Sequence, residues 1–412
     1  MGIESTKIIR KASEKPRLLA SSRYIEAQMN RRGPFQITQQ MGPYCTESCG
    51  HCYGSYSPQR TGVPNSDTIR NSLEQAVETN NNLGINFFPR ICLSDGEPLH
   101  EKNRESMRAL AEYSSRIPLA IMTNAGFAKS LREAREWMRF LRDSGLDFSS
   151  IEDQCCETIS SFHISTGRTY NVPLRNHYYF NKALKQIFPD LNFGEHLDYT
   201  ILGFEDKFPT TRSSTKLVGL IHSLYGTEDP LRITSNDGQS DLCIEFPTEN
   251  ASIFLYYGKI TPDGRAVLIP EISKKYPEKP IQPEELEFSP EESESLTIDY
   301  QGNVSFGSSQ KCVRPGKIYG NVNEGNLFEL VRKINHDEYY QATKLGGVRF
   351  LYHLAQEASQ EFRLSARDIC GVCHSIAESP ELVEAIRQGL KTTGVVESYK
   401  GYLDQRGIPN IG

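Results

Sequence analysis

Residues 45–52 read CTESCGHC, and residues 94–99, which follow an apolar run, read SDGEPL. The first stretch places Cys45, Cys49 and Cys52 in a C-x3-C-x2-C pattern on one short segment. Clustered thiolates are the soft anionic ligands that iron–sulfur clusters need. Three thiolates on a [4Fe–4S] cluster leave one iron open to a substrate or cofactor. A closed zinc site with His51 as the fourth ligand is the alternative interpretation of the same spacing.

The composition is that of a soluble globular chain. Its 412 residues include 46 Lys+Arg and 52 Asp+Glu, a net charge of −6, with no block of like charge that would suit nucleic acid. No apolar run approaches the ~20 residues that cross a bilayer, and the first 16 residues lack a signal-peptide core. We therefore expect a cytoplasmic protein without nucleic-acid or membrane partners. Its ten cysteines then favour metal binding or catalysis over disulfides.

Strand and helix patterns alternate along the first half of the chain. We expect strands at 35–38, 86–93, 119–122, 159–165 and 197–203. We expect helices from a cap at Ser66 or Asp67, after residue 99, from Leu131 to a stop near Gly145, at 176–187 and at 215–225. This alternation predicts a parallel α/β sheet with right-handed crossovers. Polar motifs after successive strands mark the end of the sheet where such folds place their chemistry.

The pattern changes after residue 235. Residues 236–295 read as a connecting insertion, rich in Pro, Glu and Ser from 270 onward. Residues 296–300 and 303–306 flank Gln301-Gly302 and predict a β-hairpin, and helices follow it. The expected units are an N-terminal helical segment (1–34), an α/β unit (35–235), the insertion (236–295) and a C-terminal domain (296–412).

Four stretches together resemble the radical SAM superfamily: CTESCGHCYG, SDGEPL, MTNAG at 122–126 and FHISTG at 162–167. The resemblance covers roughly residues 35–230 and implies a partial (β/α)6 barrel. In this family three cysteines hold a [4Fe–4S] cluster whose open iron binds S-adenosylmethionine (SAM). Reductive cleavage of SAM gives a 5′-deoxyadenosyl radical, which abstracts hydrogen from an unactivated carbon. No amino-acid side chain can supply that chemistry.

The resemblance also implies a role for individual residues. Cys45, Cys49 and Cys52 would ligate the cluster. The residues expected to contact SAM are Tyr53, Ser94, Asp95, Gly96, Glu97, Pro98, Thr123, Asn124, Ser165 and Arg175. Tyr53 takes the place beside the adenine. The segment 94–98 resembles the GGEP motif, whose backbone and glutamate meet the methionine ammonium.

The remaining contacts come from later strand ends. Thr123 and Asn124 would approach the ribose or the carboxylate, and Ser165 fits the family's serine on the fifth strand. Arg175 would pair the SAM carboxylate, with Arg168 as the alternative. Gly167 stands where the family usually has an aspartate, so the sequence departs from the pattern there.

The stretches at 297–312 and 316–332 resemble the SPASM or twitch extension behind some radical SAM barrels, an α+β unit. Gly307 and Cys312 fit its G-x4-C element, and Cys370 and Cys373 fit its late C-x2-C on loops. The resemblance implies an auxiliary [4Fe–4S] cluster. Its fourth ligand is open, and Cys243 is the candidate as the nearest spare cysteine upstream. An open iron, a non-cysteine ligand, or buried or zinc-binding cysteines are the alternatives.

We therefore predict a radical SAM enzyme, an oxidoreductase that takes electrons from a flavodoxin or ferredoxin. An electron carrier or a zinc protein would not cleave SAM. The substrate interpretation favours a residue of a ribosomally made peptide, because the insertion at 253–279 is large enough to hold an extended peptide edge-on. A small metabolite such as an aminocyclitol, sugar or nucleotide is the alternative. His163, Cys92 and the Cys155-Cys156 pair are interpreted as packing residues.

Overall fold

The structure is a computed structural model, and its longest described parts are 65–146, 313–359 and 369–405. The other described residues are 35–45, 60, 62, 154–160, 174–189, 197–203, 222, 232–235, 242–247, 252–259, 273–274, 277–281, 295–307, 362 and 364–366. The N-terminal segment 1–34 and nearly all of the helix expected at 215–225 lie outside these ranges. No helix within them is long and apolar enough to cross a membrane.

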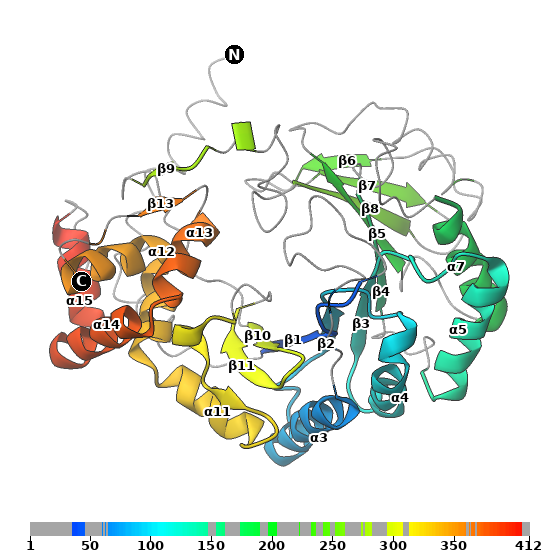
Figure 1. Cartoon of the computed structure of the whole chain (residues 1–412), viewed down its shortest axis with the longest axis horizontal. Helices are drawn as coiled ribbons and strands as arrows, with labels where there is room; N and C mark the ends of the chain where they lie inside the picture. Colours follow the sequence, from blue (N-terminus) through cyan, green and yellow to red (C-terminus); the bar gives the residue numbers. More distant parts are fainter. Residues whose placement is uncertain are drawn as a thin grey trace.

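A central run of strands carries the fold. The strands are β1 (Gln36–Gln40), β2 (Ile91–Ser94), β3 (Leu119–Thr123), β4 (Gln154–Ser160), β5 (Leu197–Gly203), β6 (Arg232–Ser235), β7 (Leu242–Pro247), β8 (Ser252–Lys259), β10 (Ser295–Ile298), β11 (Asn303–Phe306) and β12 (Gly320–Asn321). They form an 11-stranded sheet in the order β12-β11-β10-β1-β2-β3-β4-β5-β8-β7-β6 (Figure 1). From β10 to β8 every neighbouring pair is parallel. The predicted parallel α/β sheet is therefore present.

Helices follow the parallel strands and lie along the outer side of the sheet (Figure 1). They are α3 (Ser66–Leu83), α4 (Arg104–Tyr113), α5 (Leu131–Asp143) and α7 (Leu174–Ile187). Helix α3 buries Ile69, Leu73, Ala76 and Val77, the apolar face expected from its sequence. The cap is Asn65 rather than Ser66 or Asp67, since the Asn65 side chain accepts from the Asp67 amide. Helix α5 ends at Asp143, close to the stop expected near Gly145, whose φ is +98°.

Two expected strands are misplaced. The strand expected at 86–93 begins only at Ile91, because Pro89 has no N–H for the ladder. The strand expected at 159–165 is β4, which starts at Gln154 and shares only 159–160 with the expectation. Its first residues are Gln-Cys-Cys-Glu, which an apolar pattern does not mark, and residues 161–165 with His163 lie outside the described ranges.

The segment expected to be an insertion contributes strands to the sheet. β8 pairs in parallel with β5 on one side and antiparallel with β7 on the other. Residues 252–259 therefore offer no free edge to a bound peptide. On the other side of the sheet, β10 pairs in parallel with β1, so the chain after residue 295 continues the same sheet. The domain boundaries stay predictions, and the sheet crosses two of them.

The hairpin expected around Gln301-Gly302 is confirmed as the antiparallel pair β10–β11. Behind it come α11 (Leu327–Asn335), α12 (Glu338–Ala358), α13 (Ile369–Ala377), α14 (Pro380–Thr393) and α15 (Val395–Gln405). Helix α11 contacts α3, and α12 contacts α13, α14 and α15. A further short pair, β9 (Lys279–Pro280) with β13 (Ser365–Ala366), lies beside these helices (Figure 1).

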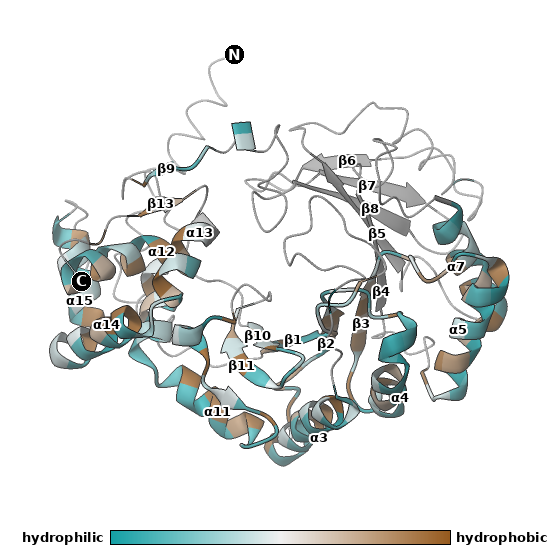
Figure 2. Ribbon diagram, in the orientation of Figure 1, coloured by the Kyte–Doolittle hydropathy of each residue, from teal (hydrophilic) through white to brown (hydrophobic). Residues whose placement is uncertain are grey.

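The strand register gives the sheet two different faces. One face carries Ile37, Ile91, Leu93, Leu119, Ile121, Leu296 and Ile298, all nearly unexposed. Figure 2 shows the hydrophobic colour along β2 and β3 and mixed colours along the amphipathic helices. Because the buried helix stripes are apolar, this is the face that the helices cover. The opposite face carries the uncharged polar residues Thr38, Gln40, Ser94, Thr297 and Ser305, with Cys92 among them.

Candidate functional site

Three strand ends meet at one edge of the sheet. β1 ends at Gln40, β2 at Ser94 and β3 at Thr123, and these strands are parallel neighbours. The segments that leave them contain Cys45, the 94–98 motif and Asn124. Parallel strands place such segments together, and the hydrogen bonds described next show that they are in contact.

Glu97 joins two of these segments. Its side chain is fully buried. Oε1 accepts from the backbone N–H of Leu99 at 3.0 Å and from Oγ1 of Thr123 at 2.6 Å, and Oε2 accepts from the backbone N–H of Asn124 at 2.9 Å. Three donors aimed at one carboxylate form a site for negative charge. Glu97 therefore fastens the end of β3 to the motif that follows β2.

Burial works against that charge. It raises the pKa of Glu97 to about 7, although hydrogen bonds from Thr123, Asn124 and Leu99 and the charge of His177 act to lower it. The carboxyl group is therefore close to its midpoint at neutral pH. A cationic group placed beside it would favour the ionised form.

Cys45 is brought to the same place. Its side chain is buried, and Nδ2 of Asn124 donates to its Sγ at 3.6 Å. The same Asn124 donates its backbone N–H to Glu97. One expected cluster ligand and two expected SAM contacts are thus linked side by side. Cys49, Cys52, Tyr53 and Ser165 lie outside the described residues, within which no group of three metal-binding side chains occurs.

The loop after β2 approaches the loop after β1 through a glycine. Asp95 and Gly96 have φ values of +71° and +65°. A Cβ on Gly96 would lie 2.6 Å from the carbonyl oxygen of Gly42 and closer still to that of Tyr44. The next residue, Glu97, donates its backbone N–H to the Tyr44 carbonyl at 3.2 Å. Only glycine fits this contact.

Of the other residues expected to contact SAM, three lie at the end of β2 or just after it and one lies on the surface. Ser94, Asp95 and Pro98 are buried at the end of β2, and the Ser94 carbonyl accepts from the Met41 amide at 3.0 Å. Arg175 is exposed in the first turn of α7, and its pairing with SAM stays a prediction.

Sequence reasoning missed several residues that support this site. Asn176 is buried beside Arg175, and its Nδ2 donates to the Ala125 carbonyl at 3.4 Å. His177 is buried and acts electrostatically on Glu97. Asn103 donates from Nδ2 to the Glu97 carbonyl at 3.0 Å. No local motif marks these residues, because only the packing of α4 and α7 brings them to the loops.

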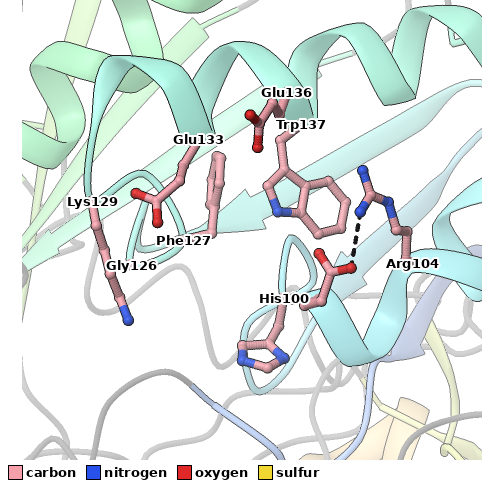
Figure 3. A pocket seen from close by; sticks show the side chains of 9 residues that line it. His100, Arg104, Gly126, Phe127, Lys129, Glu133, Glu136 and Trp137 are labelled. Atoms are coloured by element: carbon pink, nitrogen blue, oxygen red, sulfur yellow. Dashed lines mark hydrogen bonds and ion pairs between the residues drawn. The ribbon is translucent and has the colours of Figure 1, made fainter.

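A cavity lies beside this site rather than within it. It measures about 310 Å³ and is lined by His100, Glu101, Arg104, Gly126, Phe127, Lys129, Glu133, Glu136 and Trp137 (Figure 3). The His100 ring lies 4.3 Å from the Tyr44 ring, between centroids, and its Nδ1 accepts from the Lys102 amide. Burial, and then the charge of Lys102, lower the pKa of His100. The cavity does not include Glu97 or Cys45, and its walls carry both signs of charge.

The cysteines expected to bind an auxiliary cluster lie in the C-terminal part. Cys370 and Cys373 occur in helix α13 rather than on loops, and a spacing of three places them on one helix face. Cys312 is outside the described residues. The short helix at Pro315–Lys317, three residues beyond it, contacts α13. Cys243 lies in β7, toward the opposite end of the sheet from β11, and this position lends no support to its role as a fourth ligand.

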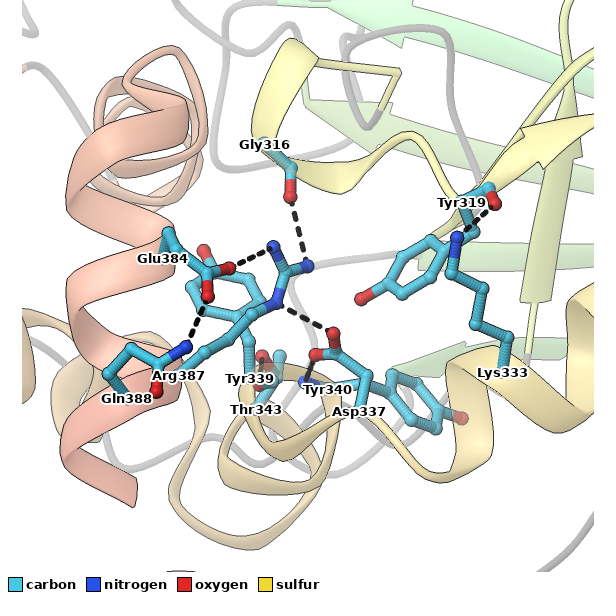
Figure 4. A network of polar contacts seen from close by, with 10 residues as sticks. All are labelled: Gly316, Tyr319, Lys333, Asp337, Tyr339, Tyr340, Thr343, Glu384, Arg387 and Gln388. Carbon is cyan, nitrogen blue, oxygen red and sulfur yellow. Dashed lines mark hydrogen bonds and ion pairs between the residues drawn. The ribbon is translucent and has the colours of Figure 1, made fainter. Parts of the chain in front are cut away.

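A partly buried ion pair holds these elements together (Figure 4). Arg387 of α14 donates from Nε to Oδ2 of Asp337 at 2.7 Å, and from a terminal nitrogen to the Gly316 carbonyl at 3.2 Å. Asp337 also caps α12. Burial and then the nearby Cys373 thiol raise the pKa of Tyr339 well above its usual value. The ion pair therefore fixes the segment after Cys312 against the helices that surround Cys373.

No protein-family model matches the sequence, and no curated protein matches it. Among solved structures, the chain is similar to BtrN in complex with AdoMet and 2-DOIA, at 14% identity and a TM-score of 0.39, over 77% of this chain and 90% of that one. It is similar to SuiB of Streptococcus suis bound to S-adenosylmethionine, at 13% identity and a TM-score of 0.33, over 76% of this chain and 71% of that one. Likeness at this level defines neither family nor activity, which are argued below from the residues of this chain.

Replacing Gly96 by Ala will disrupt the contact between the two loops. The new methyl group would collide with two backbone carbonyls, so we expect a loss of about 2 kcal/mol or more in the free energy of unfolding. Gly84→Ala is the matched control, because Gly84 has φ +63° and nothing within 4 Å of its Cβ position. That variant should lose only about 1 kcal/mol. Denaturant unfolding measures both, and equal losses would contradict the crowding argument.

Glu97 will make the stability of the ligand-free protein fall as pH rises. Because its pKa is raised from 4.5 to about 7 on folding, its contribution is largest below pH 4.5 and is lost as pH rises through 7. We expect a fall of about 2–3 kcal/mol in the free energy of unfolding between pH 5 and pH 8. Unfolding curves of the native protein and Glu97→Gln over this range test it, and an identical slope in the variant would refute the assignment.

Proposed function

We propose that this chain is a radical SAM enzyme. The observation that carries the proposal is the hydrogen bond from the Asn124 side chain to the Cys45 sulfur. Because the Asn124 backbone also bonds to Glu97, Asn124 joins the first cysteine of the C-x3-C-x2-C segment to the Glu97 loop. A donor beside a buried sulfur favours its thiolate form, which is the form that ligates iron. A buried carboxyl group with a pKa of about 7 suits an adjacent ammonium group. Both properties fit a cluster that binds an amino acid derivative.

In this proposal Cys45, Cys49 and Cys52 hold a [4Fe–4S] cluster, and the 94–98 loop with Thr123 and Asn124 orients SAM. When bound, this pair supplies a 5′-deoxyadenosyl radical able to take hydrogen from an unactivated carbon. The chain's own residues provide positioning. Thr123 and Asn124 hold the Glu97 carboxylate in place, and Gly96 lets its loop reach the segment that leads from β1 to Cys45. A flavodoxin or ferredoxin is proposed as the electron donor.

Two classes of substrate are candidates. The preference for a ribosomally made peptide relied on an open edge in residues 253–279. β8 takes residues 252–259 of this segment into the sheet, paired on both sides. A small metabolite, such as an aminocyclitol, sugar or nucleotide, is therefore an equal candidate. The proposed reaction in either case is oxidation, cross-linking, ring formation or rearrangement at the carbon that loses hydrogen.

Reductive cleavage of SAM tests the proposal. Anaerobically reconstituted protein with dithionite and SAM should release 5′-deoxyadenosine, measured by chromatography and mass spectrometry. Cys45→Ala, Cys49→Ala and Cys52→Ala should each abolish it. Cys92→Ala is the matched control, since burial raises the pKa of Cys92 to about 11 and keeps it a thiol. Cleavage that survives in the three loop variants would show that the cluster assignment is wrong.

An auxiliary cluster at Cys312, Cys370 and Cys373 is part of the proposal. What supports it is the spacing of Cys370 and Cys373, three residues apart in α13, and the contact of α13 with the short helix at Pro315–Lys317. Reconstituted protein should then contain about eight irons per chain, and Cys373→Ala about four, with SAM cleavage retained. Iron analysis checks this, with Cys92→Ala again as control. About four irons in the native protein would remove the auxiliary cluster.

A further inference from the structure

Two adjacent glutamines at the end of β1 have different environments. Gln39 and Gln40 are each about 1% exposed, and as neighbours in a strand they point to opposite faces of the sheet. Gln39 has a structural role, because its Nε2 lies 3.3 Å from the backbone carbonyls of both Gln40 and Ile298 and donates to them. It thereby links β1 to β10.

Gln40 has no such role. Within the described part of the chain, neither Nε2 nor Oε1 of Gln40 has a hydrogen-bond partner, although both atoms are buried. Burying an amide without hydrogen bonds is unfavourable by roughly 1–3 kcal/mol, so native structures rarely leave one unexplained. An apolar residue of the same volume at this position would avoid that loss of stability. An amide kept under these conditions indicates a bound partner.

The surroundings of Gln40 describe that partner. Gln40 is paired in register with Ser94, and Thr38, Thr297 and Ser305 share its face of the sheet. These side chains are small, polar and uncharged. Asp299 directly follows β10, but its carboxylate accepts hydrogen bonds from Gln301 and Asn303 in the hairpin turn. The described residues of this face therefore suit an uncharged hydrogen-bonding group.

The position of Gln40 connects it to the proposed reaction. It is the last residue of β1, five residues before Cys45, and its partner Ser94 begins the loop that leads to Glu97. The next residue, Met41, donates its backbone N–H to the Ser94 carbonyl. A group bound at Gln40 would thus lie on the polar face of the sheet, opposite the apolar face, next to the loops proposed to hold SAM.

We propose that the Gln40 amide binds an uncharged group of the substrate that offers a hydrogen-bond donor and an acceptor side by side. This inference rests on the proposed function and narrows its substrate class. A peptide bond and a pair of neighbouring hydroxyls both carry this chemistry, so the source is an amide of a peptide or the hydroxyls of a cyclitol or sugar.

The first test compares Gln40→Met with Gln39→Met in cluster-loaded protein without substrate. Gln40→Met removes a buried amide that bonds to nothing, so its melting temperature should rise by about 1–3 °C. Gln39→Met breaks two hydrogen bonds to backbone carbonyls and should lower the melting temperature. If Gln40→Met does not fold, Gln40→Leu replaces it. A fall in both Gln40 variants, like that of Gln39→Met, would show a structural role and overturn the proposal.

The second test measures binding by saturation-transfer NMR with two uncharged probes, N-acetylglycine N-methylamide and myo-inositol. One of them should bind the native protein, with affinity lowered at least tenfold in Gln40→Met and retained in Gln39→Met. Binding of the amide would identify a peptide substrate, and binding of the polyol a small metabolite. Binding of neither probe, or equal binding by Gln40→Met, would overturn the proposal.

A third measurement separates this inference from the proposed function. Formation of 5′-deoxyadenosine without substrate should stay within twofold of the native rate in Gln40→Met, since Gln40 is proposed to contact substrate and not SAM. A native protein that cleaves no SAM would refute the proposed function, while the probe measurement still tests Gln40. A large loss of cleavage confined to Gln40→Met would assign the residue to SAM and refute the substrate contact.

Discussion

The site depends on one buried carboxylate that accepts three hydrogen bonds. Glu97 receives donors from its own loop and from the end of β3, and its backbone N–H bonds to the loop after β1. A single residue therefore fixes three strand-end segments relative to one another. Burial raises the pKa of this group and the three donors lower it, so the pKa rises only to about 7. At this value the charge of a bound ligand can change the ionisation of the carboxyl group.

The two faces of the sheet divide the work of the fold. The apolar face stabilises the fold by burying Ile and Leu side chains against the helices, while the other face carries hydroxyls and amides. A polar face inside a protein makes sense only where something hydrogen-bonds to it. Strand β1 shows this division in two adjacent residues. Gln39 donates hydrogen bonds to backbone carbonyls, whereas the Gln40 amide has no hydrogen-bond partner among the described residues.

Local patterns predicted the elements whose signals are local. The apolar stripe of α3, the end of α5 shortly before Gly145 and the hairpin at Gln301-Gly302 all follow from short-range periodicity or from glycines at positive φ. The motif at 94–98 and Asn124 were found because they sit directly after apolar strands. Long-range relations were missed. Nothing near residue 252 indicates that β8 belongs between β5 and β7. Asn176, similarly, reaches the loop after β3 only because α7 packs beside α5.

The pairing of β1 with β10 joins residues 259 positions apart, as the Gln39–Ile298 hydrogen bond shows. On the ribosome, the edge of β1 that faces β10 has no native partner until residues 295–298 have emerged. Until then that edge is open to wrong pairing, and non-local closure of this kind is slow. The strand that leads to Cys45 is the one left incomplete. The segment that contains Cys45 thus acquires this support only after residues 295–298 have been made.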